Sequence, residues 1–234
     1  NDGFTPLYLA CQEGSVELAQ MLLDRGAYIN EAIEDGSSPL HMACQEGHLG
    51  VAGLLLDRGA DVNPIKKDGA TPLEIACKRG DVAPVALLLD KGADFNQHSN
   101  NGYSPLDVAF QSGNIEAARL LLEKGADIDE AKNDSISPLL IASRDGNVDA
   151  ARLLLGKGAD VNLVRKGCLA PLYIASESGH TDVVRVLLEG GADVNRTLDN
   201  GNSPLCIASQ MGNVGVARLL LQQGADVNQA TNHG

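Results

Sequence analysis

The sequence predicts an all-α solenoid, a stack of helix-turn-helix units with projecting β-hairpin-like loops. Three observations support this prediction. The 234 residues repeat with a period of 33, hydrophobic residues within each period recur at helical spacing, and Pro and Gly mark the same places each time. The composition agrees, because 44% hydrophobic residues are ample for a packed core, and the lack of Trp with only three Phe and four Tyr makes that core aliphatic.

Pro-Leu pairs 33 residues apart fix the register of the repeat, from Pro6 to Pro204 without an insertion. A Gly follows each Pro after eight residues, and a Gly-Ala pair follows after twelve more. We number frame positions from the first residue of each repeat, so Pro6 is at frame position 6. The predicted single domain, 1–234, divides into repeats 1–33, 34–66, 67–99, 100–132, 133–165, 166–198 and 199–231, with 232–234 as the start of a further repeat.

Each repeat predicts two helices and a loop. A Ser or Thr before the Pro, such as Thr5, is a predicted N-cap, and Pro at the first helical position loses no hydrogen bond. The first helix, of about nine residues, stops at a Gly such as Gly14. The second helix carries Val or Ile, then Ala, then a Leu-Leu pair on one face, and Pro84 lies in its first turn, where Pro is tolerated. The Gly of Gly-Ala ends this helix, and the Asn, Asp and Gly residues that follow predict the hairpin-like loop.

These residues resemble the consensus of the ankyrin repeat family, most closely in Gly179–Val184 and Gly191–Asn195, and the resemblance covers essentially the whole chain. It implies a curved solenoid whose first helices and hairpin tips form a concave face that meets a partner. The family's Thr-Pro-Leu-His motif keeps its His only at Ser38–His41. We therefore expect that the His is not needed for the fold in the other repeats.

The sequence predicts no catalytic, metal or cofactor site. Cys11, Cys44 and Cys77 occupy one frame position in successive repeats, about 8–10 Å apart, which is too far for a disulfide or a shared zinc ion. They are interpreted as small buried residues. The His residues fall in separate places, an Asp ladder from Asp61 to Asp226 cannot surround one cation, and no Gly-rich loop fits a phosphate. We therefore expect a non-enzyme without cofactors.

Charge and cysteine usage restrict the partners and the compartment. The formal net charge of −13 argues against nucleic acid as a ligand, and no apolar run reaches the roughly 18 residues of a membrane span. Five thiols with no pairing pattern and no secretory signal favour an intracellular protein, cytoplasmic or nuclear. The chain opens at Asn1 without a Met, which suggests a segment of a longer protein. Both end repeats are apolar and lack polar caps, which also raises end-to-end stacking as an expectation.

Function is expected at frame positions that vary between repeats, namely the hairpin tips and the face of the first helix that is expected to be exposed to solvent, at frame positions 8, 11, 12 and 13. Aromatic and aliphatic residues there predict an apolar strip, and basic residues of the third, fifth and sixth repeats would select a partner segment with acidic groups. The predicted partner-binding residues are Lys66, Lys67, Tyr103, Phe110, Ile136, Leu140, Arg144, Arg165, Lys166, Leu169, Tyr173 and Met211. The irregular tips at Ser135 and Cys168, which replace Gly, and Ala170, which replaces an N-cap hydroxyl, lie beside this strip.

The sequence therefore predicts a non-catalytic module that binds a protein or an extended peptide on the concave face. Two alternatives remain open, because a fold does not fix a function. The chain could be a structural spacer within a longer ankyrin array, or a regulatory or targeting segment of a larger enzyme.

Overall fold

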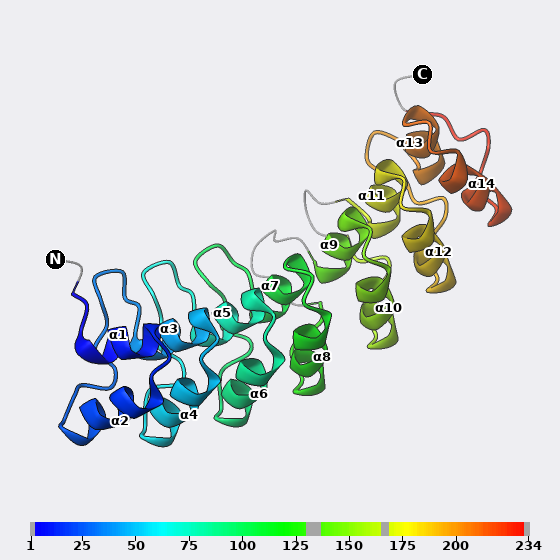
Figure 1. The fold of residues 1–234 in the computed structure, drawn as a ribbon. Coiled ribbons are helices and arrows are strands. Elements are labelled where there is room, and N and C mark those ends of the chain that lie inside the picture. Colours follow the sequence, from blue (N-terminus) through cyan, green and yellow to red (C-terminus); the bar gives the residue numbers. More distant parts are fainter. Residues whose placement is uncertain (1–2, 130–136, 165–168, 232–234) are drawn as a thin grey trace. The chain divides into compact units, whose positions relative to one another are not determined.

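The computed structural model describes residues 3–129, 137–164 and 169–231 (Figure 1). The described residues form fourteen helices and no strand, which confirms the predicted all-α solenoid of stacked helix pairs. The chain divides into two compact units, residues 1–127 and 128–234. Within the described parts of the chain, no helix combines the length and the apolar character that crossing a bilayer requires.

In each unit the first helices of the repeats lie in one row and the second helices in another (Figure 1). The first helices are α1 (Pro6–Gln12), α3 (Pro39–Glu46), α5 (Pro72–Arg79), α7 (Pro105–Gln111), α9 (Pro138–Asp145), α11 (Pro171–Ser178) and α13 (Pro204–Gln210). The second helices are α2 (Val16–Asp24), α4 (Leu49–Asp57), α6 (Val82–Asp90), α8 (Ile115–Glu123), α10 (Val148–Gly156), α12 (Thr181–Glu189) and α14 (Val214–Gln222). Helices α1 to α8 belong to the first unit and α9 to α14 to the second.

The first helices begin at the predicted caps. In six of them a Ser or Thr hydroxyl accepts a hydrogen bond from the backbone N–H at frame position 8, as Thr5 does from Tyr8 at 3.1 Å. Each of these bonds satisfies one of the N–H groups that the first turn of a helix leaves unpaired. Helix α11 begins at Ala170 without a side-chain cap, as its sequence predicts. Pro84 lies inside the first turn of α6 without breaking it.

The core lies between the two rows and consists largely of leucine. The Leu at frame position 22 in the second helix has no exposed surface in six repeats. These residues are Leu55, Leu88, Leu121, Leu154, Leu187 and Leu220. The Gly of the Gly-Ala pair then ends the helix in the left-handed conformation, for example with φ 87° at Gly26.

Neighbouring repeats are also tied by polar side chains at the start of the second helix. His48 Nε2 lies 3.0 Å from the carbonyl oxygen of Gln12 in the preceding repeat, and His180 Nε2 lies 3.0 Å from that of Arg144. The imidazole of His48 covers Gly14 so closely that a Cβ at Gly14 would come within 2.6 Å of it. A Gly is therefore required at the end of the first helix both for its φ of 71° and for the passage of this side chain.

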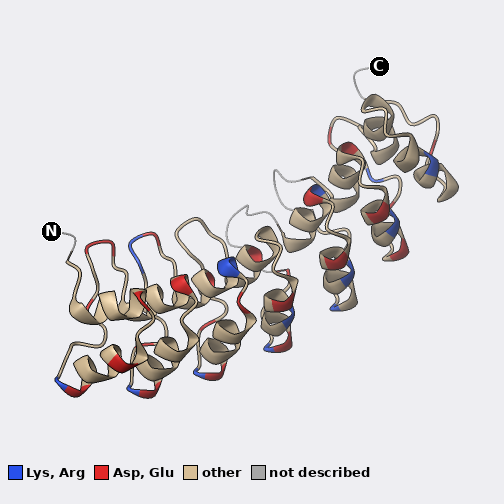
Figure 2. Cartoon of the chain, in the orientation of Figure 1, with Lys and Arg blue, Asp and Glu red and all other residues tan. Residues whose placement is uncertain are grey.

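The second helices are linked by ion pairs along their C-terminal ends, where Figure 2 shows acidic and basic residues side by side. An acid at frame position 24 pairs with a base at frame position 25 of the next repeat. The pairs are Asp24–Arg58 at 2.7 Å, Asp57–Lys91 at 2.7 Å and Asp90–Lys124 at 2.9 Å. Because they are exposed, each contributes little to stability but favours one register of stacking.

The loops between repeats form tight turns rather than paired strands. Ile33 N–H donates to Ser37 O at 3.0 Å, and Gly36 N–H donates to Ile33 O at 2.9 Å, which is the hydrogen bonding of a short hairpin. Successive tips also bond to one another, since Asn100 N–H donates to Asp68 O at 3.0 Å. A Cβ at Gly69 would lie 2.5 Å from the nitrogen of Asn100, so close stacking of the tips requires a Gly there.

Candidate functional site

The hairpin tips and the adjacent side of the first helices form a surface that we call the inner face of each unit. Its helical part is the stripe at frame position 12, which is exposed in six of the seven first helices. These residues are Gln12, Gln45, Lys78, Gln111, Arg144 and Gln210. The stripe is narrow because each first helix has only seven or eight residues, and neighbouring first helices of one unit pack against each other, as α3 does with α1 and α5.

A cleft of about 440 Å³ opens on the inner face of the first unit, between the tips and α5. It is lined by Gln45, Lys66, Asp68, Ala70, Glu74, Ile75, Lys78, Arg79 and Asn101. The tips contribute Lys66, Asp68 and Asn101, while α5 contributes four of the nine residues. The cleft is therefore assembled from three successive repeats, and its walls are mainly polar.

The basic residues of the cleft are held by neighbouring groups. Lys66 Nζ lies 3.1 Å from Asp35 Oδ2, and the lysine side chain is only 18% exposed. Arg79 pairs with Asp81, and its Nη1 donates to Gln45 O at 2.8 Å. Because each of these cations has a carboxylate beside it, the positive field of the cleft is weaker than its number of basic residues indicates.

Glu74 places an unusual carboxyl group in the wall of this cleft. Burial raises its pKa from 4.5 to about 7; the nearby Asp68 also raises it, while a hydrogen bond from Ser99 and the charge of Lys78 lower it. Its Oε2 is buried with no hydrogen-bond partner among the described residues. Near neutral pH this carboxyl exchanges between a protonated donor and an ionised acceptor.

The inner face of the second unit carries an apolar cluster in place of a polar cleft. Ala170, Tyr173 and Ile207 are buried together, and Leu169 and Leu198 pack against them while remaining half-buried. The Tyr173 hydroxyl accepts a hydrogen bond from Asn202 Nδ2 at 3.1 Å. This cluster joins α11, α13 and two loops into one surface. Met211, at the end of α13, is 49% exposed.

Three residues expected to face solvent are buried, so that expectation is wrong. The exposed fractions are 3% for Phe110, 8% for Leu140 and 5% for Tyr173. They occupy frame positions 8 and 11, which lie on a flank of the first helix rather than on the stripe at frame position 12. At Tyr173, Ile207 and the adjacent loop residues cover this flank of α11. The burial leaves untested whether these residues help to bind a partner.

The other predicted residues are distributed over both units. Lys67 is exposed on a tip and donates its N–H to Asp35 O at 2.9 Å, whereas Tyr103 is half-buried. Arg144 is exposed, and its Nε lies 2.8 Å from Asp145 Oδ1. Several further predictions lie outside the described residues, namely Ile136, Arg165 and Lys166, with the irregular tip residues Ser135 and Cys168.

The predicted set omits Glu74, Lys78 and Arg79, which line the cleft. The sequence signal for them is the run of charges at frame positions 8, 12 and 13 of the third repeat, where other repeats carry mostly neutral residues. Their joint placement could not be deduced from that run, because the tip residues opposite them come from two different loops.

The cysteines confirm their predicted structural place. Cys11, Cys44 and Cys77 are buried, and burial raises the pKa of Cys11 and of Cys44 to about 12. A thiol with so high a pKa is a poor nucleophile and a poor metal ligand at neutral pH. The described cysteines are free thiols, and the described residues hold no group of three or more His, Cys, Asp or Glu side chains placed to share a metal ion.

Comparisons with known proteins agree with this architecture. A family model described as ankyrin repeats (3 copies) matches residues 1–66, 59–132 and 139–231. The chain is similar to the crystal structure of the human ASB11 ankyrin repeat domain, with 31% identity, a TM-score of 0.84, and coverage of 95% of this chain and 99% of that one. It is also similar to the ankyrin repeat domain of Bcl-3, described as a unique member of the IkappaB protein family, with 29% identity, a TM-score of 0.82, and coverage of 93% and 100%. A search of curated protein sequences gave no significant match. The chain belongs to the ankyrin repeat family.

Proposed function

We propose that this chain is a non-catalytic module that binds a protein partner, as an extended segment, on its inner face. The observation that supports the proposal is the cleft over α5, because a concave surface built by three repeats can enclose a peptide backbone and several side chains. Its Lys, Arg, Glu and Asn side chains offer both donors and acceptors. Ankyrin repeat domains are generally protein-protein interaction modules, which supports the same assignment.

The exposed and the buried members of the predicted set have different roles in this proposal. Lys66, Lys67, Arg144, Leu169 and Met211 reach the surface and contact the partner directly, together with the half-buried Tyr103. Phe110, Leu140 and Tyr173 are buried, and in this proposal they hold the first helices in place. Ile136, Arg165 and Lys166 remain in the proposed surface on sequence grounds. A partner segment that binds the cleft would carry acidic residues, and a segment that binds the cluster would carry aliphatic residues.

The compartment proposed for this interaction is intracellular. Cys11, Cys44, Cys77 and Cys206 are free thiols, which is typical of a reducing environment. The formal net charge of −13 opposes binding to nucleic acid, so the ligand is proposed to be a protein.

Affinity capture with matched variants tests the proposal. The wild type, the Lys67→Glu, Lys78→Glu variant and the Leu169→Glu, Met211→Glu variant are used as bait, and captured proteins are quantified by mass spectrometry. The control is Lys91→Glu, Lys124→Glu, which reverses the same number of charges at the ends of the second helices. Circular dichroism verifies that every bait is folded.

The expected result is a protein that the wild type and the control capture equally and that at least one inner-face variant loses. Replacing a central contact residue should weaken binding by about 1–4 kcal/mol, measured by calorimetry with the purified partner. If the control loses the partner while both inner-face variants retain it, the inner face is the wrong surface.

A further inference from the structure

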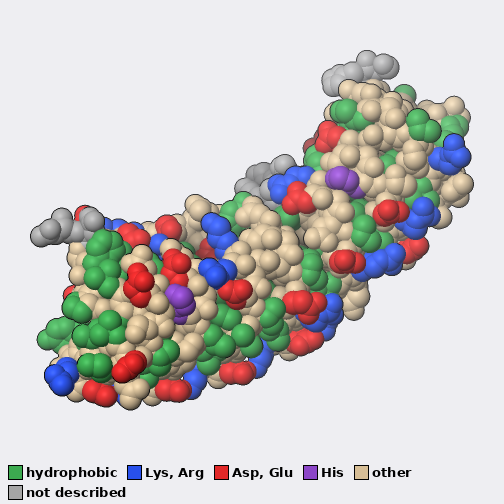
Figure 3. All heavy atoms as spheres, viewed as in Figure 1, with side chains coloured by type: hydrophobic (Ala, Val, Ile, Leu, Met, Phe, Trp, Pro, Cys, Tyr) green, Lys and Arg blue, Asp and Glu red, His purple; other side chains and the backbone are tan. Residues whose placement is uncertain are grey.

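The cleft over α5 holds a carboxyl group and an ammonium group that no other repeat combines. Glu74 and Lys78 occupy frame positions 8 and 12 of the third repeat, and only this repeat has an acid at the first of these positions and a base at the second. Residues four apart on a helix lie on the same face, and both side chains line the cleft. In Figure 3, basic and acidic side chains are gathered over α5.

Both groups have bonding capacity that the described residues do not use. Glu74 Oε2 is buried and has no hydrogen-bond partner among them, a condition that costs free energy until a proton or a ligand relieves it. Lys78 is exposed and forms no ion pair within the same part of the chain. The other two bases of the cleft, Lys66 and Arg79, each have a carboxylate partner. Glu74 and Lys78 are therefore available to a ligand.

The unpaired charges near the cleft favour an anionic ligand. Lys67, Asp68 and Lys78 lie in its tip or on α5 and form no ion pair with any described residue. With Glu74 protonated, two positive charges face one negative charge; with Glu74 ionised, the two signs balance. An ionised Glu74 would also repel a bound carboxylate at short range. An anion therefore binds best when Glu74 carries its proton, whereas a lysine or arginine of the partner would be repelled by Lys78.

Other titratable groups near α5 lie outside the cleft. Helices α3, α6 and α7 pack against α5, and of their residues only the neutral Gln45 lines the cleft. On α5 itself Arg79 is paired and Cys77 is buried. The titratable residues of the three packed helices are His41, Cys44, Glu46, Asp90 and Asp107, and none of them lines the cleft. A response of the cleft to pH near neutrality is therefore assigned to Glu74.

We propose that the cleft binds a carboxylate side chain of the partner between Lys78 and the protonated carboxyl group of Glu74, so that an ionised Glu74 takes up a proton on binding. This inference rests on the proposed function, because it takes the inner face as the binding surface. Lys78 donates an N–H and Glu74 donates its O–H to the bound carboxylate, both as charge-assisted hydrogen bonds. The terminal torsion of a glutamate side chain is broad, so either oxygen of Glu74 can turn toward the ligand.

The proton linkage gives the affinity a definite pH dependence. Burial raises the pKa of Glu74 to about 7, whereas an exposed Glu of the partner has a pKa of about 4 and stays ionised at neutral pH. Since only the protonated form of Glu74 binds, the affinity should be nearly constant below pH 6 and fall about tenfold between pH 6 and pH 8. A cleft that recognises the carboxylate through Lys78 alone would show no such decline.

Titration of the whole chain with a blocked tripeptide, followed by NMR, tests the inference. The probe is acetyl-Ala-Glu-Ala-amide, and the comparison probes carry Gln or Lys in place of Glu. At pH 6 the Glu probe should shift the amide signals of α5 and of the adjacent tips saturably, and more tightly than either comparison probe. At pH 8 its dissociation constant should be about tenfold higher. With the probe at about ten times its dissociation constant, the carboxyl ¹³C signal of Glu74 should titrate about one pH unit higher.

The variant Glu74→Gln separates a binding role from a structural one. Its amide has the size of the protonated carboxyl and donates an N–H at every pH, so this variant should bind the Glu probe equally at pH 6 and pH 8. The matched control Glu123→Gln, exposed at the end of α8, should keep the tenfold decline. Circular dichroism verifies that each variant is folded.

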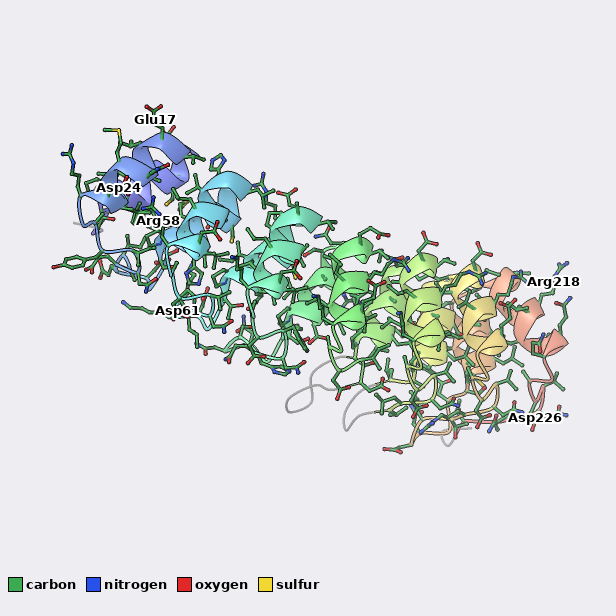
Figure 4. The ribbon with its side chains drawn as sticks, turned by 90° about the horizontal axis from the view of Figure 1, so that it is seen from below. Glu17, Asp24, Arg58, Asp61, Arg218 and Asp226 are labelled. Carbon is green, nitrogen blue, oxygen red and sulfur yellow. The ribbon has the colours of Figure 1, made fainter. Side chains whose placement is uncertain are left out.

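A second pair of variants tests the contribution of the ammonium group. Lys78→Gln should weaken binding of the Glu probe about fivefold or more at pH 6. The control Lys91→Gln should not, because Lys91 belongs to the row of exposed ion pairs along the second helices, in which Figure 4 labels Asp24 and Arg58.

The inference is overturned if the Glu probe gives no saturable shifts at α5, if the Gln or Lys probe binds as tightly, or if Glu74→Gln keeps the tenfold decline. Affinity capture of a partner does not depend on this contact, so the two proposals fail separately. A partner lost from the inner-face variants, with no binding of the probe, rejects the contact at Glu74 alone. A bound probe with no captured partner rejects the proposed function alone.

Discussion

At the scale of single residues, His41 shows how one side chain serves both its own helix and the next repeat. Its Nδ1 accepts from Ser38 N–H at 3.1 Å, and its Nε2 lies 3.2 Å from Ala70 O in the following repeat. An acceptor at Nδ1 and a donor at Nε2 require the neutral imidazole. Burial, the largest influence, lowers the pKa of His41 to about 4, and the charge of Lys66 acts in the same direction.

This gives a pH dependence of stability with a definite sign. Below about pH 6.5 the unfolded chain takes up a proton at this histidine, whereas folded His41 stays neutral. The contribution of His41 to the free energy of unfolding is therefore complete above pH 6.5 and declines as the pH falls toward 4. The expected loss is about 3 kcal/mol in the free energy of urea unfolding. His41→Asn keeps an acceptor near Ser38 N–H but cannot be protonated, and it should show a shallower decline. Parallel pH profiles for the two proteins would rule this out.

Glu74 acts in the opposite direction, because its pKa is raised by burial to about 7. Between pH 4.5 and 7 the unfolded chain releases the proton of this carboxyl group, whereas the folded chain keeps it. The contribution of Glu74 to the free energy of unfolding is therefore complete below pH 4.5 and is lost as the pH rises through 7. Glu74→Gln should therefore stabilise the protein more at pH 8 than at pH 4.5. We expect a difference of about 1–2 kcal/mol, reduced because the side chain is partly exposed. Denaturant titrations at both pH values measure it, and an equal effect at both would contradict the assignment.

At the scale of the element, the helix boundaries follow from local sequence. A Ser or Thr, a Pro and a Gly at fixed frame positions determine where each first helix starts and stops, because capping and the left-handed conformation involve only nearby atoms. Local sequence does not determine in the same way which side chains of a helix are buried. Frame positions 8 and 11 were expected to be exposed, yet Phe110, Leu140 and Tyr173 are buried there. Helical periodicity identifies a flank but not whether a neighbouring element covers it.

The missing cap of α11 leads to a stability prediction. Ala170→Ser should supply the hydroxyl that the other first helices have and raise the free energy of unfolding by about 1 kcal/mol. The equivalent Ser203 is buried and accepts from Cys206 N–H at 3.2 Å, which indicates that a serine fits this position. Ser203→Ala should lower the free energy of unfolding by a similar amount. Thermal and urea unfolding of the pair measure both changes, and a destabilised Ala170→Ser would show that this helix start differs from the others.

At the scale of the whole molecule, the contribution of a residue depends on its place in the stack. Leu22 and Leu55 share frame position 22, but Leu55 has no exposed surface, whereas Leu22 is half-buried at the edge of a hollow beside Tyr28. Leu55→Ala should cost about 3–5 kcal/mol through lost burial and a cavity. Leu22→Ala should cost about 1–2 kcal/mol, because its side chain is only half-buried. Urea unfolding at low protein concentration compares them, and equal costs would mean that the end repeat is packed like the interior.

The sequence alone determined the repeat, the fold class, the helix ends and the buried cysteines of this protein. These features depend on periodicity and on atoms a few residues apart, and seven copies of one pattern leave little ambiguity. Tertiary structure alone decided which side chains of a first helix stay exposed and how Lys66, Glu74 and Arg79 meet in one cleft. The physical reason is that these properties arise from contacts between repeats, among residues roughly one period apart. The sequence pattern does not give the distances and orientations of such residues in space.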